Sequence, residues 1–139
     1  MKYVGLDLGS KTLGIAVSDA LGILARAVET YRFEENHYED AVSYAISFCR
    51  KEGAQTIVLG YPKHMNGDAG VRAKISEDFK AQIEANSDIN VVLQDERLTT
   101  VLVDKAMIGG HVRRKERKEK KDEMAAVVIL QNYLDQLAF

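Results

Sequence analysis

The spacing of apolar residues changes after Asn36 from a strand-type to a helix-type pattern, and this change constrains the fold more than any other feature. The first part contains short runs that are apolar or alternate with small residues, as strands do. After Asn36, apolar residues recur at helical spacing, and helix-type and strand-type segments then alternate. The predicted strands are residues 2–8, 12–18, 25–33, 55–60 and 89–93, and the predicted helices are residues 36–53, 68–83, 99–110 and about 120–137.

These elements predict one α/β domain over residues 1–139, with a mixed sheet between two layers of helices. A short turn that contains Gly9 joins the first two predicted strands, so we expect an antiparallel hairpin. The later strands are separated by helices, which favours parallel pairing. At the start of the first predicted helix, Asn36 and Glu39 have the spacing of a capping box.

Asp7 is an acidic residue inside an apolar, strand-type run. On a strand it shares one face with Tyr3 and Gly5, and the residues expected opposite it, such as Gly14, are small. A carboxylate in such a place is costly to bury unless it is paired or binds a metal ion. From residue type alone, two interpretations stay open: a metal ligand, or a structural aspartate that accepts hydrogen bonds from the turn at residues 9–11.

Asp95 and Glu96 follow the predicted strand at residues 89–93, and ligands of open α/β sheets collect at this end of the strands. Adjacent strand residues point to opposite faces, so only one of the two should share a site with Asp7. The alternative interpretation is a polar strand end with an ion pair to Arg97.

Asp122 lies near the start of the last predicted helix. Ala125, Ala126 and Ile129 follow it by three, four and seven residues, so they share its face, and this apolar face should pack on the sheet. An acid that only interacts with the helix dipole, worth about 0.3–1 kcal/mol, is the alternative. That alternative explains an acid in the first turn but not its alignment with the apolar face.

Carboxylates from two strand ends and one helix start suit one kind of chemistry in particular. Mg²⁺ prefers oxygen ligands, keeps several waters and is completed by phosphate oxygens of a substrate. Two such ions about 3.5–4 Å apart can activate a water molecule and stabilise the leaving oxygen of a phosphodiester. The residues therefore indicate a metal site of clustered carboxylates that uses Asp7, Asp122 and one of Asp95 and Glu96.

The charge of the chain is unevenly distributed. The net charge is −2, but residues 113–121 (RRKERKEKK) carry +5, so the remainder carries −7. A concentrated basic segment can contact the phosphates of a nucleic acid, and its first residues, Arg113, Arg114 and Lys115, are candidates for this role. A solvated charged helix end is the alternative.

The composition also bears on where the protein works. No stretch approaches the ~20 apolar residues of a membrane helix, and the N-terminal residues make a poor signal peptide. The one cysteine, Cys49, cannot form an internal disulfide. We therefore expect a cytoplasmic protein with no membrane partner, acting as a monomer or a weak homodimer.

Four motifs, in order along nearly the whole chain, resemble the YqgF family, whose members are described as Holliday junction resolvases or pre-16S rRNA nucleases. They are GLDLGSKTLGIAVSD (Gly5–Asp19), VLGYPKHMNG (Val58–Gly67), VVLQDERLTT (Val91–Thr100) and KKDEMAAVVILQNYLD (Lys120–Asp135). Each motif alone is weak, because D-x-G near a hairpin also occurs in actin-like ATPases. The four motifs together, in this order along the chain, are specific to the family.

The resemblance implies an RNase H-like three-layer α/β fold with a five-stranded mixed sheet. It also implies a nuclease that uses Mg²⁺ or Mn²⁺ and processes the 5′ end of pre-16S rRNA, a structured RNA. It places the family's acids, both catalytic and metal-binding, on Asp7, Glu96 and Asp122. With the basic segment added, the expected substrate-binding residues are Lys11, Lys63, Asn66, Arg97, Arg113, Arg114 and Lys115. A polar turn after a strand is the alternative for Lys63 and Asn66.

The chain departs from the family pattern at three positions. Lys121 precedes Asp122 where an aliphatic residue is usual, Gln94 stands where an aromatic residue is common, and Val71 replaces a proline ahead of Arg72. Three other functions stay open from the residues: a resolvase of branched DNA, a nucleotide-binding relative of the actin-like ATPases, and a nucleic-acid-binding module without catalysis.

Overall fold

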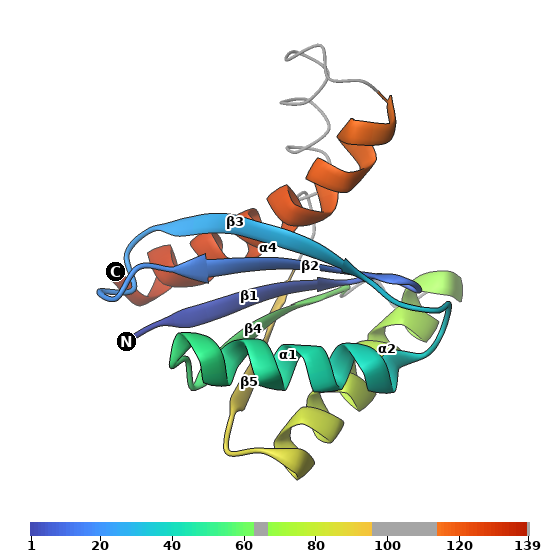
Figure 1. Cartoon of the computed structure of the whole chain (residues 1–139), viewed down its shortest axis with the longest axis horizontal. Coiled ribbons are helices and arrows are strands. Elements are labelled where there is room, and N and C mark those ends of the chain that lie inside the picture. The colour runs from blue at the N-terminus through green and yellow to red at the C-terminus, as the bar shows by residue number, and fades with distance from the viewer. Residues whose placement is uncertain (63–66, 96–113, 139) are drawn as a thin grey trace.

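The computed structural model describes residues 1–62, 67–95 and 114–138, with the backbone alone for residues 67–69 and 114–123 (Figure 1). Five strands form one sheet in the order β3-β2-β1-β4-β5. The strands are β1 (Tyr3–Leu8), β2 (Thr12–Ser18), β3 (Ala25–Arg32), β4 (Thr56–Tyr61) and β5 (Asn90–Asp95), and the helices are α1 (Tyr38–Glu52), α2 (Gly67–Asn86) and α4 (Arg114–Ala138).

The sheet is mixed and lies between two layers of helices, which confirms the predicted α/β fold. Strand β1 pairs antiparallel with β2 and parallel with β4. Strands β2 and β3 pair antiparallel, and β4 and β5 pair parallel. Helices α1 and α2 cover one face of the sheet, and α4 covers the other (Figure 1). None of the described helices combines the length and hydropathy that a membrane span requires.

The start of α1 differs from the predicted capping box. The residue that caps the helix is His37, and no side chain there bonds to the first N–H groups. Asn36 instead adopts a left-handed conformation with φ of 65°, and its N–H donates to the Ser10 carbonyl at 2.8 Å. Asparagine tolerates this conformation better than most residues. Asn36 therefore forms the turn that leads into the helix.

Helix α4 begins earlier than predicted, at Arg114 in place of about Lys120. The charges of the basic segment suggested a helix end, yet lysine, arginine and glutamate are all good helix formers. The predicted helix at residues 99–110 lies outside the described residues. The part of α4 that contains the basic residues extends away from the sheet (Figure 1).

Helix α4 packs tightly on the sheet at Gly5 of β1. A methyl group built on Gly5 would lie 2.6 Å from the Cβ atom of Leu130 and 2.8 Å from the carbonyl oxygen of Ala126. No real side chain fits at such distances. Glycine at position 5 therefore lets the backbone of the helix rest directly on the central strand.

This contact predicts that Gly5→Ala destabilises the protein by about 1–3 kcal/mol, because the helix must shift or the core must absorb strain. Urea unfolding measures the change in free energy. Gly70→Ala is the matched control, since a Cβ there meets nothing within 4 Å and alanine is favoured over glycine in a helix by about 0.5–1 kcal/mol. A Gly5→Ala protein as stable as the wild type would contradict the close contact.

Candidate active site

Asp7 lies at the centre of a row of residues that crosses the sheet near the carboxyl end of β1. On one side its partner is Gly14 of β2, which pairs with Thr30 of β3. On the other side the next strand presents Gly60, whose partner on β5 is Gln94. The half-buried carboxylate of Asp7 thus stands opposite Gly14, and the β1–β4 register, continued by one residue past its last pair, would set Gly60 on the other side. Gly14 presents no side chain toward Asp7 from the β2 side.

The position of Gly60 beside Asp7 follows from the register of β1 with β4, whose paired residues extend to Leu6 and Leu59. Gly60 follows Leu59 as Asp7 follows Leu6, which extends the same register by one residue. The Asp7 side chain also interacts with another group of the protein, so its carboxylate is not isolated.

The row lies on the face of the sheet that α4 covers. Strand side chains alternate, so Asp7 shares its face with Gly5, and Gly5 is the residue on which Leu130 and Ala126 pack. This agrees with the prediction that the apolar face of the last helix packs on the sheet near Asp7.

The direction of α4 relative to β1 indicates which part of the helix approaches Asp7. Near the start of the strand, the rings of Tyr3 and Tyr133 lie 5.9 Å apart. Two residues along the strand, the contacts have moved back along the helix to Leu130 and Ala126. A strand advances about 3.3 Å per residue and a helix about 1.5 Å, so two further strand residues correspond to about one helical turn. The backbone of Asp122 lies in α4, one turn before Ala126.

The register of β5 indicates that its last residue, Asp95, and the next residue, Glu96, belong to opposite faces of the sheet. Asp95 pairs with Tyr61, and the hydroxyl of Tyr61 donates to Glu77 of α2 at 2.8 Å. Asp95 therefore belongs to the face that α2 covers, opposite to the face of Asp7. Gln94 belongs to the face of Asp7, and strand alternation, continued by two residues, predicts the same face for Glu96. Glu96 itself lies outside the described residues.

The structure describes few of the predicted substrate-binding residues. Lys11 is exposed in the turn between β1 and β2, at the same end of the sheet as Asp7. Arg114 and Lys115 form the start of α4, as backbone alone. Lys63, Asn66, Arg97 and Arg113 lie outside the described residues. Among the side chains that the structure describes, no three His, Cys, Asp or Glu residues form a group suited to a metal ion.

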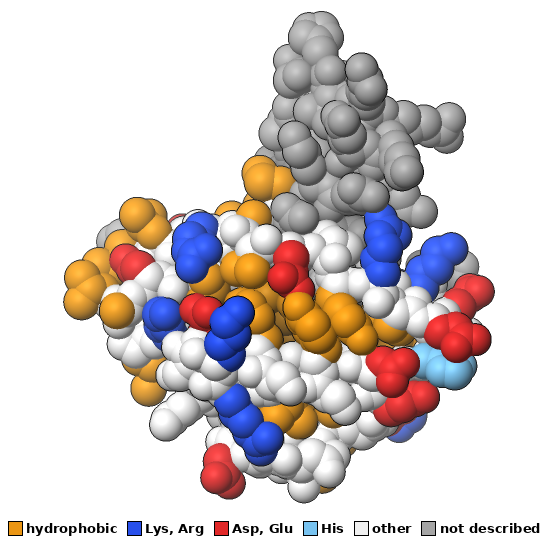
Figure 2. Space-filling view, viewed as in Figure 1, with side chains coloured by type: hydrophobic (Ala, Val, Ile, Leu, Met, Phe, Trp, Pro, Cys, Tyr) orange, Lys and Arg blue, Asp and Glu red, His pale blue; other side chains and the backbone are white. Residues whose placement is uncertain are grey.

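Acidic side chains gather beyond Lys11, where the chain passes from β3 to α1. Figure 2 shows them at one end of the molecule around a histidine. The Nδ1 atom of His37 lies 3.7 Å from a carboxylate oxygen of Glu34 and 3.6 Å from one of Glu39. Such a cluster repels phosphates.

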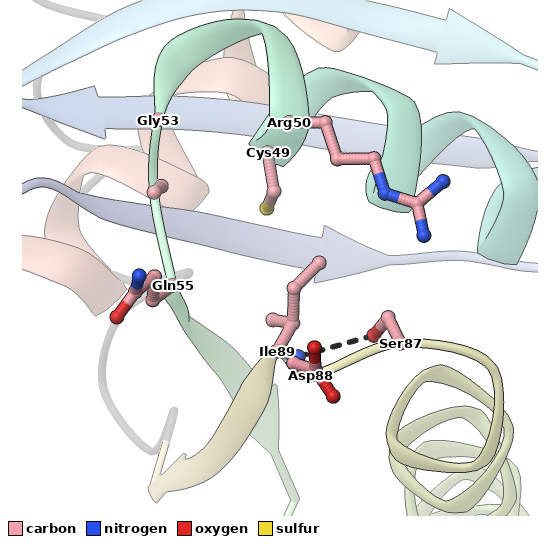
Figure 3. A pocket seen from close by; sticks show the side chains of 8 residues that line it. Cys49, Arg50, Gly53, Gln55, Ser87, Asp88 and Ile89 are labelled. Atoms are coloured by element: carbon pink, nitrogen blue, oxygen red, sulfur yellow. Dashed lines mark hydrogen bonds between the residues drawn. The ribbon is translucent and has the colours of Figure 1, made fainter.

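A pocket of about 380 Å³ lies at the other end of the strands from Asp7, where β4 and β5 begin. Figure 3 shows side chains from the end of α1 and from the start of β5 around it, with the N–H of Ile89 donating to Ser87. Burial raises the pKa of Cys49, which lines this pocket, to about 12. The thiol is therefore protonated at neutral pH and is neither a nucleophile nor a thiolate ligand.

Two features of the site were not predicted from the sequence. The first is Gly60, which the register of β1 with β4 brings toward the β4 side of Asp7 although it lies some fifty residues further along the chain. The second is Arg72, which donates from its Nη2 atom to the carbonyl of Leu8 at 2.8 Å. Neither is marked by a local pattern of residue types.

Comparison with known proteins agrees with the motifs. Residues 1–136 match a family model described as "RuvX: Holliday junction resolvase". The chain is 45% identical over 134 residues to a protein of Lactococcus lactis subsp. cremoris (strain SK11), covering 96% of this chain and 94% of the relative. It is 44% identical to a protein of Bacillus subtilis (strain 168), covering 99% of both. Both relatives carry the name "Putative pre-16S rRNA nuclease".

Two solved structures with similar folds are Holliday junction resolvases. The RuvC protein of T. thermophilus in complex with a Holliday junction superposes with a TM-score of 0.60 at 12% identity, covering 99% of this chain and 96% of that one. The fowlpox virus resolvase, also with junction DNA, gives 0.58 at 11% identity and covers both chains completely. At these identities the likeness shows the RNase H-like fold alone. The match over nearly the whole chain, together with the curated relatives, shows that the chain belongs to the RuvX family, the YqgF family of its motifs, and is a nuclease that hydrolyses phosphodiester bonds.

Proposed function

We propose that this chain is a metal-dependent nuclease that processes the 5′ end of precursor 16S rRNA in the cytoplasm, with Asp7, Glu96 and Asp122 as its catalytic acids. The observation that carries the proposal is the position of Asp7 opposite Gly14, on the face of the sheet that α4 covers. The names of the curated relatives support precursor 16S rRNA as the substrate.

The residues around Asp7 fit a divalent cation. A carboxylate supplies the oxygen ligand that Mg²⁺ and Mn²⁺ prefer, and Gly14, which presents no side chain toward Asp7, leaves space for waters and phosphate oxygens. Asp122 would approach from the turn of α4 before Ala126, and Glu96 from the end of β5. The bound ions would activate water and stabilise the leaving oxygen of the phosphodiester.

The proposed roles of the protein groups are to hold the ions and to position the RNA. The strand fixes Asp7 in the sheet, so its carboxylate needs little reorganisation when substrate binds. Lys11 lies at the rim of the same end. Lys63, Asn66 and Arg97, which follow β4 and β5 in the sequence, are proposed to contact the RNA.

The basic part of α4 is proposed to bind RNA beyond the sheet. Residues 114–121 are helical, and helical spacing gives Lys115 and Lys118 the same face as Asp122. Arg117 and Lys120 fall on the opposite face. Arg113 and Arg114, at the start of this segment, are also proposed to contact phosphates.

A resolvase of four-way DNA junctions is the second candidate, because the family description names that activity. Symmetric cleavage of a junction requires two active sites and hence a dimer. Cleavage of an rRNA precursor and of a junction, compared side by side with the oligomeric state, separates the two candidates. A strict monomer that cuts the precursor and not the junction would exclude the resolvase.

Asp7→Asn should lower Mg²⁺- or Mn²⁺-dependent cleavage about 100-fold or more, because the amide is a neutral and poorer ligand. Cleavage is followed on a gel with the rRNA precursor, and circular dichroism checks that the variant is folded. Full activity in the folded variant would contradict the proposed catalytic role of Asp7.

Glu96→Gln should lower cleavage by a similar factor, whereas Asp95→Asn should change it only a few-fold, because Asp95 belongs to the α2 face of the sheet. The two variants are matched, since each replaces one acid of the same motif by its amide. The rates are measured at saturating metal ion. Equal losses in both, or a larger loss for Asp95→Asn, would reject the assignment.

Replacing Lys115 and Lys118 together by glutamine should weaken RNA binding and reduce the slope of log K against log salt by about one to two. The control replaces Arg117 and Lys120 by glutamine, which changes the net charge equally on the opposite helix face. Binding is measured by fluorescence anisotropy over a range of salt concentrations. The same slope change in both pairs of variants would favour the alternative interpretation, in which the segment is only a solvated charged surface.

A further inference from the structure

The carbonyl group of Leu8, next to Asp7, points to the side of β1 where the pairing with β4 has ended. The N–H groups of Tyr3 and Gly9 donate toward β2, to Ser18 and Thr12. Odd-numbered residues of β1 therefore direct their backbone groups toward β2, and even-numbered residues direct theirs toward β4. The carbonyl of Leu8 consequently points to the β4 side.

Strand β4 cannot supply a donor for this carbonyl. The paired residues of β1 and β4 end at Leu6 and Leu59. Two residues further along, Leu8 would oppose Tyr61, and in a parallel ladder the N–H of residue 62 would donate to the Leu8 carbonyl. Residue 62 is Pro62, the only proline of the chain, and proline has no N–H. A ladder bond from residue 62 to the Leu8 carbonyl is therefore ruled out.

Arg72 of α2 supplies the hydrogen-bond donor that β4 lacks at this position. Its Nη2 atom donates to the Leu8 carbonyl at 2.8 Å. Helix α2 lies on the face of the sheet opposite to α4, so the guanidinium group reaches the ends of β1 and β4 from the side away from the apolar face of α4. The contact fixes a positive charge one residue from Asp7.

One bond to a carbonyl leaves most of the guanidinium group unused. Arginine has five N–H donors in a rigid fork that suits phosphate oxygens. Arg72 is exposed, so a ligand can reach these donors. Among the described residues, no carboxylate forms an ion pair with it. Lys74, one half-turn away, is paired with Asp78 at 3.2 Å.

We propose that Arg72 binds the nucleic-acid strand through the phosphate next to the one that is hydrolysed, while its bond to Leu8 holds the guanidinium in place. This inference rests on the proposed nuclease site at Asp7. The bond to Leu8 fixes the geometry of the cation, and the missing N–H of Pro62 makes the position available to it. A lysine could supply the charge but not both contacts in one plane.

The test measures binding of RNA that spans the 5′ end of precursor 16S rRNA, in the Asp7→Asn background so that no cleavage occurs. Arg72→Gln should weaken binding about tenfold or more and reduce the salt slope by about 0.7–0.9, the value for one lost phosphate contact. Arg72→Lys should keep the slope but still bind several-fold more weakly. Lys74→Gln, the control with the same charge change, should leave both quantities unchanged.

A purely structural role predicts a different result. If Arg72 only completes the hydrogen bonding of Leu8, Arg72→Gln lowers the melting temperature and leaves the salt slope unchanged, and the proposal is overturned. Equal slope changes for Arg72→Gln and Lys74→Gln overturn it as well. If Arg72→Gln does not fold, the wild-type protein is tested with RNAs that each carry one neutral methylphosphonate linkage. The slope of log K against log salt should fall when that linkage lies beside the scissile one. Equal slopes for every position of the linkage reject the contact.

The test also separates this proposal from the proposed function. A protein that binds the RNA with the expected slopes but never cleaves it, even with Asp7 present, contradicts the nuclease assignment and keeps the Arg72 contact. A protein that cleaves and loses activity in Asp7→Asn, but shows no slope change at Arg72, keeps the nuclease site and rejects the contact.

Discussion

The contact between α4 and Gly5 is the one on which both the α4 side of the core and the proposed site depend. It leaves no room for a Cβ atom between the helix and the central strand. Because α4 is one continuous element, the same contact fixes where the turn of Asp122 lies relative to Asp7. It also directs the basic residues at the other end of the helix beyond the edge of the sheet (Figure 1). Packing and chemistry are therefore positioned by a single glycine.

Much of the fold follows from local patterns in the sequence. Alternation and helical spacing predicted the order of strands and helices in the described residues, and the short turn at Gly9 predicted the hairpin that sets Gly14 opposite Asp7. The predictions at Asn36 and Lys120 were wrong for the same reason. Each relied on one residue type as a helix boundary, but Asn36 favours a left-handed turn, and a run of charged residues forms a helix as readily as an apolar one.

The parts of the site that could not be predicted depend on pairing between distant segments. The neighbours of Asp7 on the β4 side come from the register of β1 with β4, and the bond from Arg72 spans 64 residues. The face of Asp95 likewise required its pairing with Tyr61. Strand alternation alone showed that Asp95 and Glu96 differ, without showing which one faces Asp7. The predicted roles of Glu96 and Asp122 came from the family motif and from helical spacing.

The absence of an N–H at Pro62 also divides the sheet into regions of unequal local stability. Toward the amino end, β1 is bonded on both sides and is covered by α4, so its exposure requires the core to open. Beyond Leu6, the bond that the described residues show on the β4 side comes from an exposed arginine in place of a ladder. Local opening costs less free energy where backbone bonds are fewer and more exposed. The end of the sheet at which the nucleic acid is proposed to bind can therefore adjust its backbone while the rest of the domain keeps its structure.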